Sequence, residues 1–174
     1  MTTATESTPE RKIEPALKLN FYSHATLDCR DIQRTRKFFQ EFLGFETVQM
    51  ADMAFWARLG GDQIIVVVQS PARKENMPFL NHNGLDVGTE AEVDAAYAVV
   101  KRDAEKWGLK KITRPVVQHG TYCFYFWDMD DNAWEILANP QGGYSWGFKL
   151  GDQEGAGHMS RDFKRPPSTL GKGE

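Results

Sequence analysis

The spacing of hydrophobic and polar positions changes several times between residues 20 and 70. In residues 20–28 apolar and polar positions alternate, as they do in a strand. After Asp31 the apolar side chains are spaced by three and four, as they are on one face of a helix. Asp31 suits the cap at the start of this helix, and Gly44 suits its end. Three further apolar runs, at 45–50, 54–59 and 63–69, read as strands. The pattern predicts one strand, one helix and three strands.

A second stretch repeats this order. Residues 81–87 (NHNGLDV) read as a strand, and Thr89 and Glu92 follow in the spacing of a capping box. The next helix presents an apolar face from Val93 to Trp107, and Gly108 ends it. Three strands are then expected at about 111–117, 121–128 and 132–138. The chain therefore contains a βαβββ unit twice.

Two such units predict an α+β fold, in which paired βαβββ modules form a curved mixed sheet shaped like a cup. We place the modules at 19–70 and 80–140, together making one domain over 19–140. Residues 1–18 are expected to be a disordered lead. Residues 141–174 are rich in Gly and Pro, which favours an extended tail or a lid over a third domain.

Composition narrows the kind of partner. The net charge of -3 and the scattered basic residues argue against binding to nucleic acid or to an anionic membrane surface. The longest aliphatic run, 64–68, is far too short to cross a bilayer, and the first residues do not resemble a secretory signal. With only Cys29 and Cys123, a disulfide framework is not expected. We predict a cytoplasmic protein that binds small molecules.

One carboxylate stands out because it lies in an apolar strand, the one expected at about 132–138. Glu135 must face water, form a salt bridge or bind a metal, since an isolated buried carboxylate costs several kcal/mol. Aligning the modules by their first strands places His24 on His82, an offset of 58 residues. Aligning their last strands places Glu135 on Val66. Two imidazoles and a carboxylate on one lining face suit a divalent metal. The alternative is that the two histidines are hydrogen-bonded in the core and Glu135 faces solvent.

The segments HATLDCRDIQRTRKFFQEFLGFE, HNGLDV and YFWDMDDNAWEI, within residues 19–140, resemble the vicinal oxygen chelate superfamily. This superfamily includes glyoxalase I, fosfomycin-resistance proteins, extradiol ring-cleavage dioxygenases and bleomycin-sequestering proteins. The resemblance implies the paired βαβββ fold. It also implies a divalent metal bound at the positions of His24, His82 and Glu135, with the substrate chelating the metal through adjacent oxygens.

Among these activities, the resemblance favours an extradiol-type dioxygenase that uses Fe(II). Val66 stands where glyoxalase I and related epimerases carry a fourth ligand, and a valine cannot bind metal. Tyr125 precedes Glu135 by ten residues, as a substrate-contacting tyrosine does in the extradiol enzymes. Their additional acid–base histidine has no counterpart in VVVQSP. We expect His119, in the turn at 118–120, to replace it, with His158 in the tail as a second candidate.

Aromatic side chains are available to line a pocket for a small aromatic or dicarbonyl substrate, and we expect Tyr22, Trp56, Cys123, Trp127 and His158 to contact it, with Tyr144 nearby. Two other functions remain open. One is redox-neutral lyase, isomerase or thiol-transferase chemistry with Zn(II), Mn(II) or Co(II), and the other is sequestration of a ligand without turnover. We expect a homodimer, and the cup could close within one chain or between two.

Overall fold

The computed structural model describes residues 15–70, 72, 76–139, 143–160 and 162–165. The first module contains β1 (His24–Cys29), α1 (Ile32–Glu41), β2 (Glu46–Ala51), β3 (Ala54–Arg58) and β4 (Ile64–Gln69). Its sheet has the order β1-β4-β3-β2, and β1 runs parallel to β4. The Asp31 side chain accepts hydrogen bonds from the first turn of α1, so the predicted cap is confirmed.

The second module follows a short 3-10 helix, η1 (Phe79–Asn81). It contains β5 (Asn83–Val87), α2 (Glu90–Arg102), α3 (Ala104–Trp107), β6 (Val116–Gln118), β7 (Thr121–Trp127) and β8 (Ala133–Ala138). Its sheet order, β5-β8-β7-β6, repeats that of the first module. The predicted α+β fold of two βαβββ modules is confirmed. Thr89 caps α2 through the backbone N–H of Glu92, as the spacing indicated.

Strand pairing shows that the two modules match residue by residue. Thr26 on β1 pairs with Val66 on β4, and Gly84 on β5 pairs with Glu135 on β8. These pairs reproduce both offsets read from the sequence, because 84 − 26 is 58 and 135 − 66 is 69. His24 and His82 therefore occupy equivalent places, at the start of equivalent strands. The sheet face that carries His82 and Glu135 corresponds to the face that carries His24.

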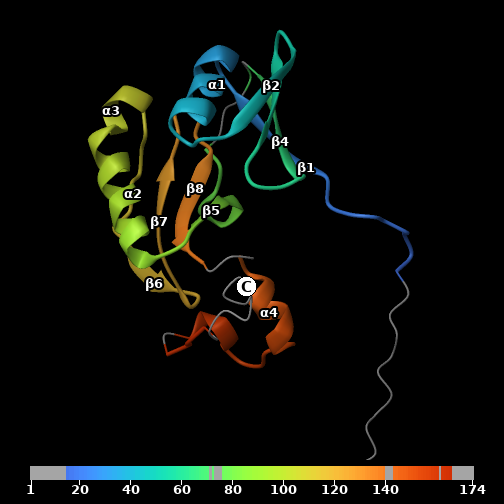
Figure 1. Ribbon diagram of the computed structural model, residues 1–174, viewed down its shortest axis with the longest axis vertical. Helices are drawn as coiled ribbons and strands as arrows, with labels where there is room; N and C mark the ends of the chain where they lie inside the picture. Colours follow the sequence, from blue (N-terminus) through green and yellow to red (C-terminus); the bar gives the residue numbers. More distant parts are fainter. Residues whose placement is uncertain (1–14, 71, 73–75, 140–142, 161, 166–174) are drawn as a thin grey trace, which may run out of the picture.

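The two modules share one hydrophobic core. It forms between the helices and the sheet faces opposite to those that carry His24 and His82. Phe38 on α1 contacts Trp107 on α3 with ring centroids 5.7 Å apart, and Phe39 contacts Trp134 on β8 at 5.6 Å. The faces that carry His24 and His82 consequently both point away from the common core. Figure 1 shows the first sheet (β1, β2, β4) beside the second sheet rather than continuing it.

The turn between β7 and β8 fastens the second module to the first. Arg30, directly after β1, forms a salt bridge of 2.6 Å with Asp131, and its backbone N–H donates to Asp130 at 2.8 Å. Thr35 on α1 also donates to Asp130. The acidic residues of this turn are therefore structural, and they hold together segments about a hundred residues apart.

The tail contains α4 (Ser145–Leu150) and a second 3-10 helix, η2 (Gly157–Met159). In Figure 1 it lies at the end of the molecule opposite α1 and β2, below β6 and β7. Trp146 stacks on Phe163 within it, with ring centroids 5.8 Å apart. No helix in the described part of the chain is both long and apolar enough to span a membrane.

Several predicted boundaries differ from the structure. The strand expected at 111–117 contains only Val116–Gln118, because Lys111 has a positive φ of 49° and Pro115 has no N–H to pair. The second helix is interrupted at Asp103, so it forms α2 and α3. The first strand begins at His24 rather than at residue 20. Much of the predicted disordered lead, residues 1–14, lies outside the described residues.

Candidate functional site

His82 and Glu135 come together on the outward face of the second sheet. His82 directly precedes β5, and Glu135 lies at the middle of β8. The distance between His82 Nε2 and Glu135 Oε2 is 3.2 Å. Glu135 is 4% exposed, so this carboxylate is buried, and it has a histidine rather than a lysine or arginine beside it.

Neighbouring groups fix both side chains. The other ring nitrogen of His82, Nδ1, lies 2.7 Å from the Phe79 carbonyl, so Nδ1 carries a hydrogen and donates a hydrogen bond to this oxygen. Nε2 is the nitrogen that faces Glu135, where a metal ion or a hydrogen can lie between the two groups. The Tyr125 hydroxyl donates to Glu135 Oε1 across 2.6 Å. Tyr125 in turn accepts a hydrogen bond from Gln118 on β6. Such partners orient metal-binding histidines and carboxylates in proteins.

Burial keeps the groups around Glu135 protonated. Burial raises the pKa of Tyr125, and the adjacent Glu135 carboxylate raises it further. The pKa of Cys123 rises to about 12 for the same two reasons. The phenol is therefore a hydrogen-bond donor to Glu135, and the Cys123 thiol is not an ionised ligand.

A cavity of about 520 Å³ opens beside this pair. Its floor comes from the second sheet, through His82, Tyr125 and Glu135, with His119 from the turn between β6 and β7. The opposite wall comes from the tail, and its side chains include Tyr144, Trp146, Leu150, Asp152, Gln153, His158 and Phe163. Two of the three predicted metal ligands, several aromatic side chains and two further imidazoles thus line one chamber.

His24 lies elsewhere. It is exposed at the start of β1, where its Nδ1 is 2.8 Å from the Ser23 hydroxyl. Across the described ranges, no three residues among His, Cys, Asp and Glu lie close enough together to hold a metal ion. The structure therefore brings together two of the three predicted ligands, and it places the third on the equivalent face of the other module.

Some of the other predicted site residues line the chamber, and others do not. Tyr125, His119 and His158 line the chamber. Cys123 and Trp127 share the sheet face of Tyr125 but are buried, and the Trp127 indole donates to the Met77 carbonyl at 2.9 Å. Trp56 is 41% exposed on the outward face of the first sheet, and Tyr22 is 65% exposed before β1. Neither Trp56 nor Tyr22 lines the chamber.

Sequence reasoning missed several residues of the site. Nothing in the sequence pointed to the Phe79 carbonyl or to Gln118 as groups that orient His82 and Tyr125. Trp146 and Phe163 were not singled out either. The signal available for them was the cluster of aromatic residues in an otherwise Gly-rich tail, because isolated aromatics in such a segment need a surface to cover.

The donor set fits a divalent metal. The Nε2 atom of His82 and the buried Glu135 carboxylate offer two ligands that Mn, Fe, Co and Zn ions all accept. Within one chain, the sheet face that carries His24 and the sheet face that carries His82 both point away from the common core. His24 could therefore supply the third ligand only from a second copy of the chain.

Comparisons with known proteins agree with this fold. Residues 22–136 match the family model "Glyoxalase/Bleomycin resistance protein/Dioxygenase superfamily". A fosfomycin resistance protein, FosX, from Listeria monocytogenes is 25% identical with a TM-score of 0.57, and the alignment covers 71% of this chain and 97% of that one. A FosX structure with Mn(II) and sulfate is 24% identical, again with a TM-score of 0.57, over 71% and 94%.

A glyoxalase/bleomycin resistance protein/dioxygenase from Nocardioides is 16% identical with a TM-score of 0.53, over 74% of this chain and 89% of that one. A search of curated proteins finds no relative of this sequence.

Proposed function

We propose, because this chain belongs to the glyoxalase/bleomycin resistance protein/dioxygenase superfamily, that it is a divalent-metal-dependent enzyme whose metal centre forms between two copies. One copy supplies His82 and Glu135, and the other supplies His24. The observation that carries this proposal is the matched register: His24 and His82 are equivalent residues on equivalent sheet faces, and both faces point away from the core within one chain.

The outward face of the first sheet supports a partner. Val48, Trp56 and Val68 lie on this face, and each is at least about a third exposed (51%, 41% and 36%). A sheet face with several exposed apolar side chains beside a candidate ligand is typical of a surface that another chain covers. A symmetric dimer that joins this face to the second module of its partner would form two identical centres.

Each residue of the site has a distinct task in this proposal. A divalent metal held by His24, His82 and Glu135 would polarise two adjacent oxygen atoms of a bound substrate. Tyr125 fixes the Glu135 carboxylate, and the Phe79 carbonyl holds the His82 ring so that Nε2 faces the metal. His119 and His158 place two imidazoles in the same chamber, with ring centroids 5.5 Å apart. The aromatic side chains of the tail keep bulk water away from the chamber.

We favour redox-neutral chemistry in this chamber. Among the structures described above, FosX is the one at 25% identity, and it is a fosfomycin resistance protein. One of its structures contains Mn(II). Ring cleavage with Fe(II) and O₂ is the second candidate, and the imidazole of His119 in the chamber favours it, because the sequence has no histidine at the usual acid–base position.

Mixing two inactive variants tests the shared centre. His24→Ala keeps His82 and Glu135 intact, whereas Glu135→Ala keeps His24 intact. If the two are refolded together, the mixed dimer regains one complete site, so metal content should recover to about one quarter of the wild-type value per chain. Each variant refolded alone should bind none tightly. A mixture that binds no more metal than the separate variants would show that the centre does not form between copies.

The type of chemistry needs a separate measurement. Protein loaded with Mn(II) or Zn(II) should act on substrates without consuming oxygen, and loading with Fe(II) should produce no oxygen uptake with a panel of catechols. Oxygen uptake that depends on Fe(II) and is lost in His82→Ala would instead establish ring cleavage. His82→Ala removes a ligand from each centre, so it serves as the control for adventitious iron.

A further inference from the structure

The tail lies beyond the matched family model, which ends at residue 136. It nevertheless supplies most of the chamber wall opposite Glu135. Segments that a rigid scaffold positions often carry binding residues, so the tail is a natural place for residues that select the substrate.

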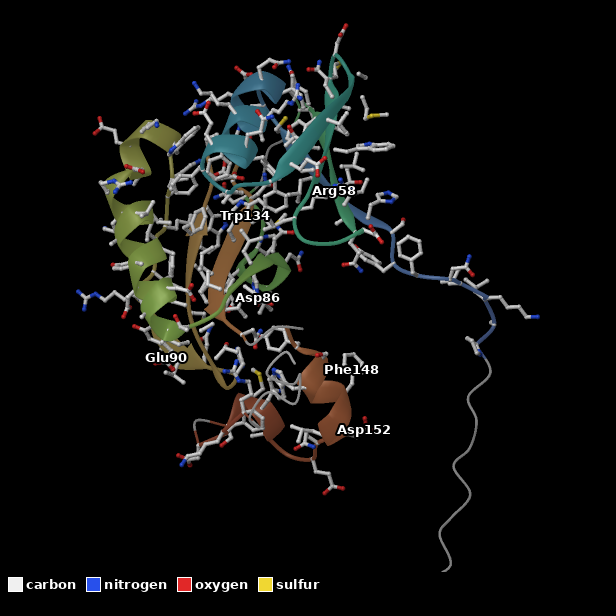
Figure 2. All side chains as sticks on the ribbon, in the orientation of Figure 1. Arg58, Asp86, Glu90, Trp134, Phe148 and Asp152 are labelled. Carbon is white, nitrogen blue, oxygen red and sulfur yellow. The ribbon has the colours of Figure 1, made fainter. Side chains whose placement is uncertain are left out.

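The tail is held to its own module at several points. Arg165 donates to the Ala138 carbonyl and to Asn139 Oδ1, both at 2.9 Å, at the end of β8. Phe163 packs on Gly120 so closely that a Cβ on this glycine would lie 2.8 Å from the ring. Figure 2 shows Asp152 in the tail well away from Arg58 on the first sheet.

The tail also brings two imidazoles together. The rings of His119 and His158 have centroids 5.5 Å apart, and both line the chamber. Within the residues that the structure describes, neither ring forms a hydrogen bond or an ion pair, and Nδ1 of His119 is shielded from solvent without a partner. The acidic residues among those described that line the chamber, Glu135 and Asp152, are not bonded to either ring.

The hairpin turn that carries His119 fixes where its side chain lies. His119 and Gly120 have φ values of 54° and 72°, as the two central residues of a type I′ hairpin do. Asn, Asp and Gly are the usual residues at the first of these positions, and histidine also occurs at positive φ more often than most residues do. The turn is therefore compatible with histidine, and the feature that calls for an explanation is the unbonded imidazole that lines the cavity.

We propose that His119 and His158 bind an anionic group of the substrate, a carboxylate or a phosphonate, at the end of the chamber away from the metal ligands. Each imidazolium can donate one charge-assisted hydrogen bond to the anion. Tyr144, Trp146 and Phe163 then cover the apolar part of the substrate. This inference rests on the proposed function, because it assigns the substrate class of the same chamber: a small acid that also carries two adjacent oxygens.

Binding of model acids to metal-free protein tests the anion site without the metal centre. The metal is removed with a chelator, the chelator is dialysed away, and benzoate, phenylphosphonate and the neutral benzamide are titrated by calorimetry at pH 6.5. Wild-type protein should bind both acids more tightly than benzamide. His119→Asn suits the αL backbone and removes the imidazole, and His158→Asn removes the second ring. Each should weaken binding of the acids about tenfold, the loss of one charge-assisted hydrogen bond.

A matched control separates this effect from general damage to the tail. Phe148 on α4 is 92% exposed and does not line the chamber, and Figure 2 shows its side chain projecting from the helix. Phe148→Ala should leave binding of all three probes unchanged. Equal affinity of the wild type for benzoate and benzamide, or full affinity for the acids in both histidine variants, would overturn the proposal.

The metal centre is measured separately in the same variants. His119→Asn and His158→Asn should retain wild-type metal content, because neither is a ligand. If metal binding fails in the wild type but the acids still bind through the two histidines, the proposed function is wrong and the anion site stands. His24→Ala removes a metal ligand but neither imidazole, so it should bind the acids as tightly as the wild type does, and loss of acid binding in this variant would count against the anion site itself.

Discussion

Tyr125 and Glu135 face each other across two neighbouring antiparallel strands, and the phenol donates a hydrogen bond of 2.6 Å to the carboxylate. Trp56 and Val66 form the equivalent pair in the first module. The same backbone geometry therefore carries a polar pair in one module and an apolar pair in the other.

Removing the phenol hydroxyl should weaken metal binding. Tyr125→Phe leaves the Glu135 carboxylate without its orienting donor, and loss of such a partner typically lowers metal affinity about 10–100-fold. Calorimetric titration of Mn(II) or Zn(II) into metal-free protein measures the change. Tyr122→Phe is the matched control, because Tyr122 lies on the same strand and donates to Asp94 at 2.8 Å on the helix side. Equal affinity in Tyr125→Phe and Tyr122→Phe would contradict the orienting role.

Neutralising Asp131 should loosen the contact between the modules. This carboxylate accepts hydrogen bonds of 2.6 Å from both Arg30 and Lys110, and Asn tolerates the positive φ of 64° at this position. Asp131→Asn should lower the free energy of unfolding at pH 7 by about 1–3 kcal/mol, as measured by urea denaturation. Glu46→Gln, which breaks the exposed Arg58 pair at a similar distance of 2.7 Å, should cause no measurable loss.

The effect of Asp131→Asn should depend on pH. Burial alone would raise the pKa of Asp131, but hydrogen bonds from Lys110 and Arg30 outweigh it and hold the pKa below its ordinary value. Because the folded pKa is depressed, the ionised carboxylate stabilises the protein above about pH 4, and this contribution is lost as the pH falls through the folded pKa. The difference between wild type and variant should shrink in acid, and a constant difference would contradict this assignment.

Asp128 should show the opposite dependence. Burial raises its pKa to about 6, even though Trp134 and Asn132 donate hydrogen bonds to it. The folded protein therefore holds this proton more tightly than the unfolded chain does. Relative to Asp128→Asn, the free energy of unfolding of the wild type should fall by on the order of 2–3 kcal/mol as the pH rises from about 4 to about 6. Denaturation curves of both proteins across this range measure it, and a difference that grows with pH would be the contrary result.

Both thiols should be inert in the folded protein. Cys29 and Cys123 are fully buried, and burial raises the pKa of each to about 12. Since the thiolate is the reactive form, Ellman's reagent at pH 8 should react slowly until denaturant is added, after which two thiols per chain should react. Rapid reaction of one thiol in native protein would show that its strand opens locally.

Much of the fold was predictable because local signals agreed with the tertiary structure. Asp31 and Thr89 mark the starts of the helices they cap, and the repeat offsets of 58 and 69 correspond to actual strand pairs. The strand before Gln118 was overestimated, because its apolar residues follow a backbone that Lys111 and Pro115 interrupt. Helix α4 was missed, because six residues between glycines give too short a pattern to read.

The arrangement of the two modules could not be read from the sequence. Both faces of the first sheet carry apolar residues, such as Phe55 on the core side and Trp56 on the outer side, so alternation does not reveal which face is covered. His24 and His82 were correctly aligned as equivalent residues. Their separation follows from the core that the two modules share, through contacts such as that of Phe39 on α1 with Trp134 on β8, which only the three-dimensional structure shows.

The matched register has an evolutionary consequence. Duplication of one βαβββ module would first give two identical halves, and the two halves of this chain now differ at the paired positions Val66 and Glu135. A single Val66→Glu change would place a carboxylate beside His24 as Glu135 lies beside His82. In a two-copy assembly this would convert a centre with three protein ligands into one with four, which X-ray absorption of the metal-loaded variant would detect. The number of protein ligands in this fold can thus change by one codon, while the strand pairing stays intact.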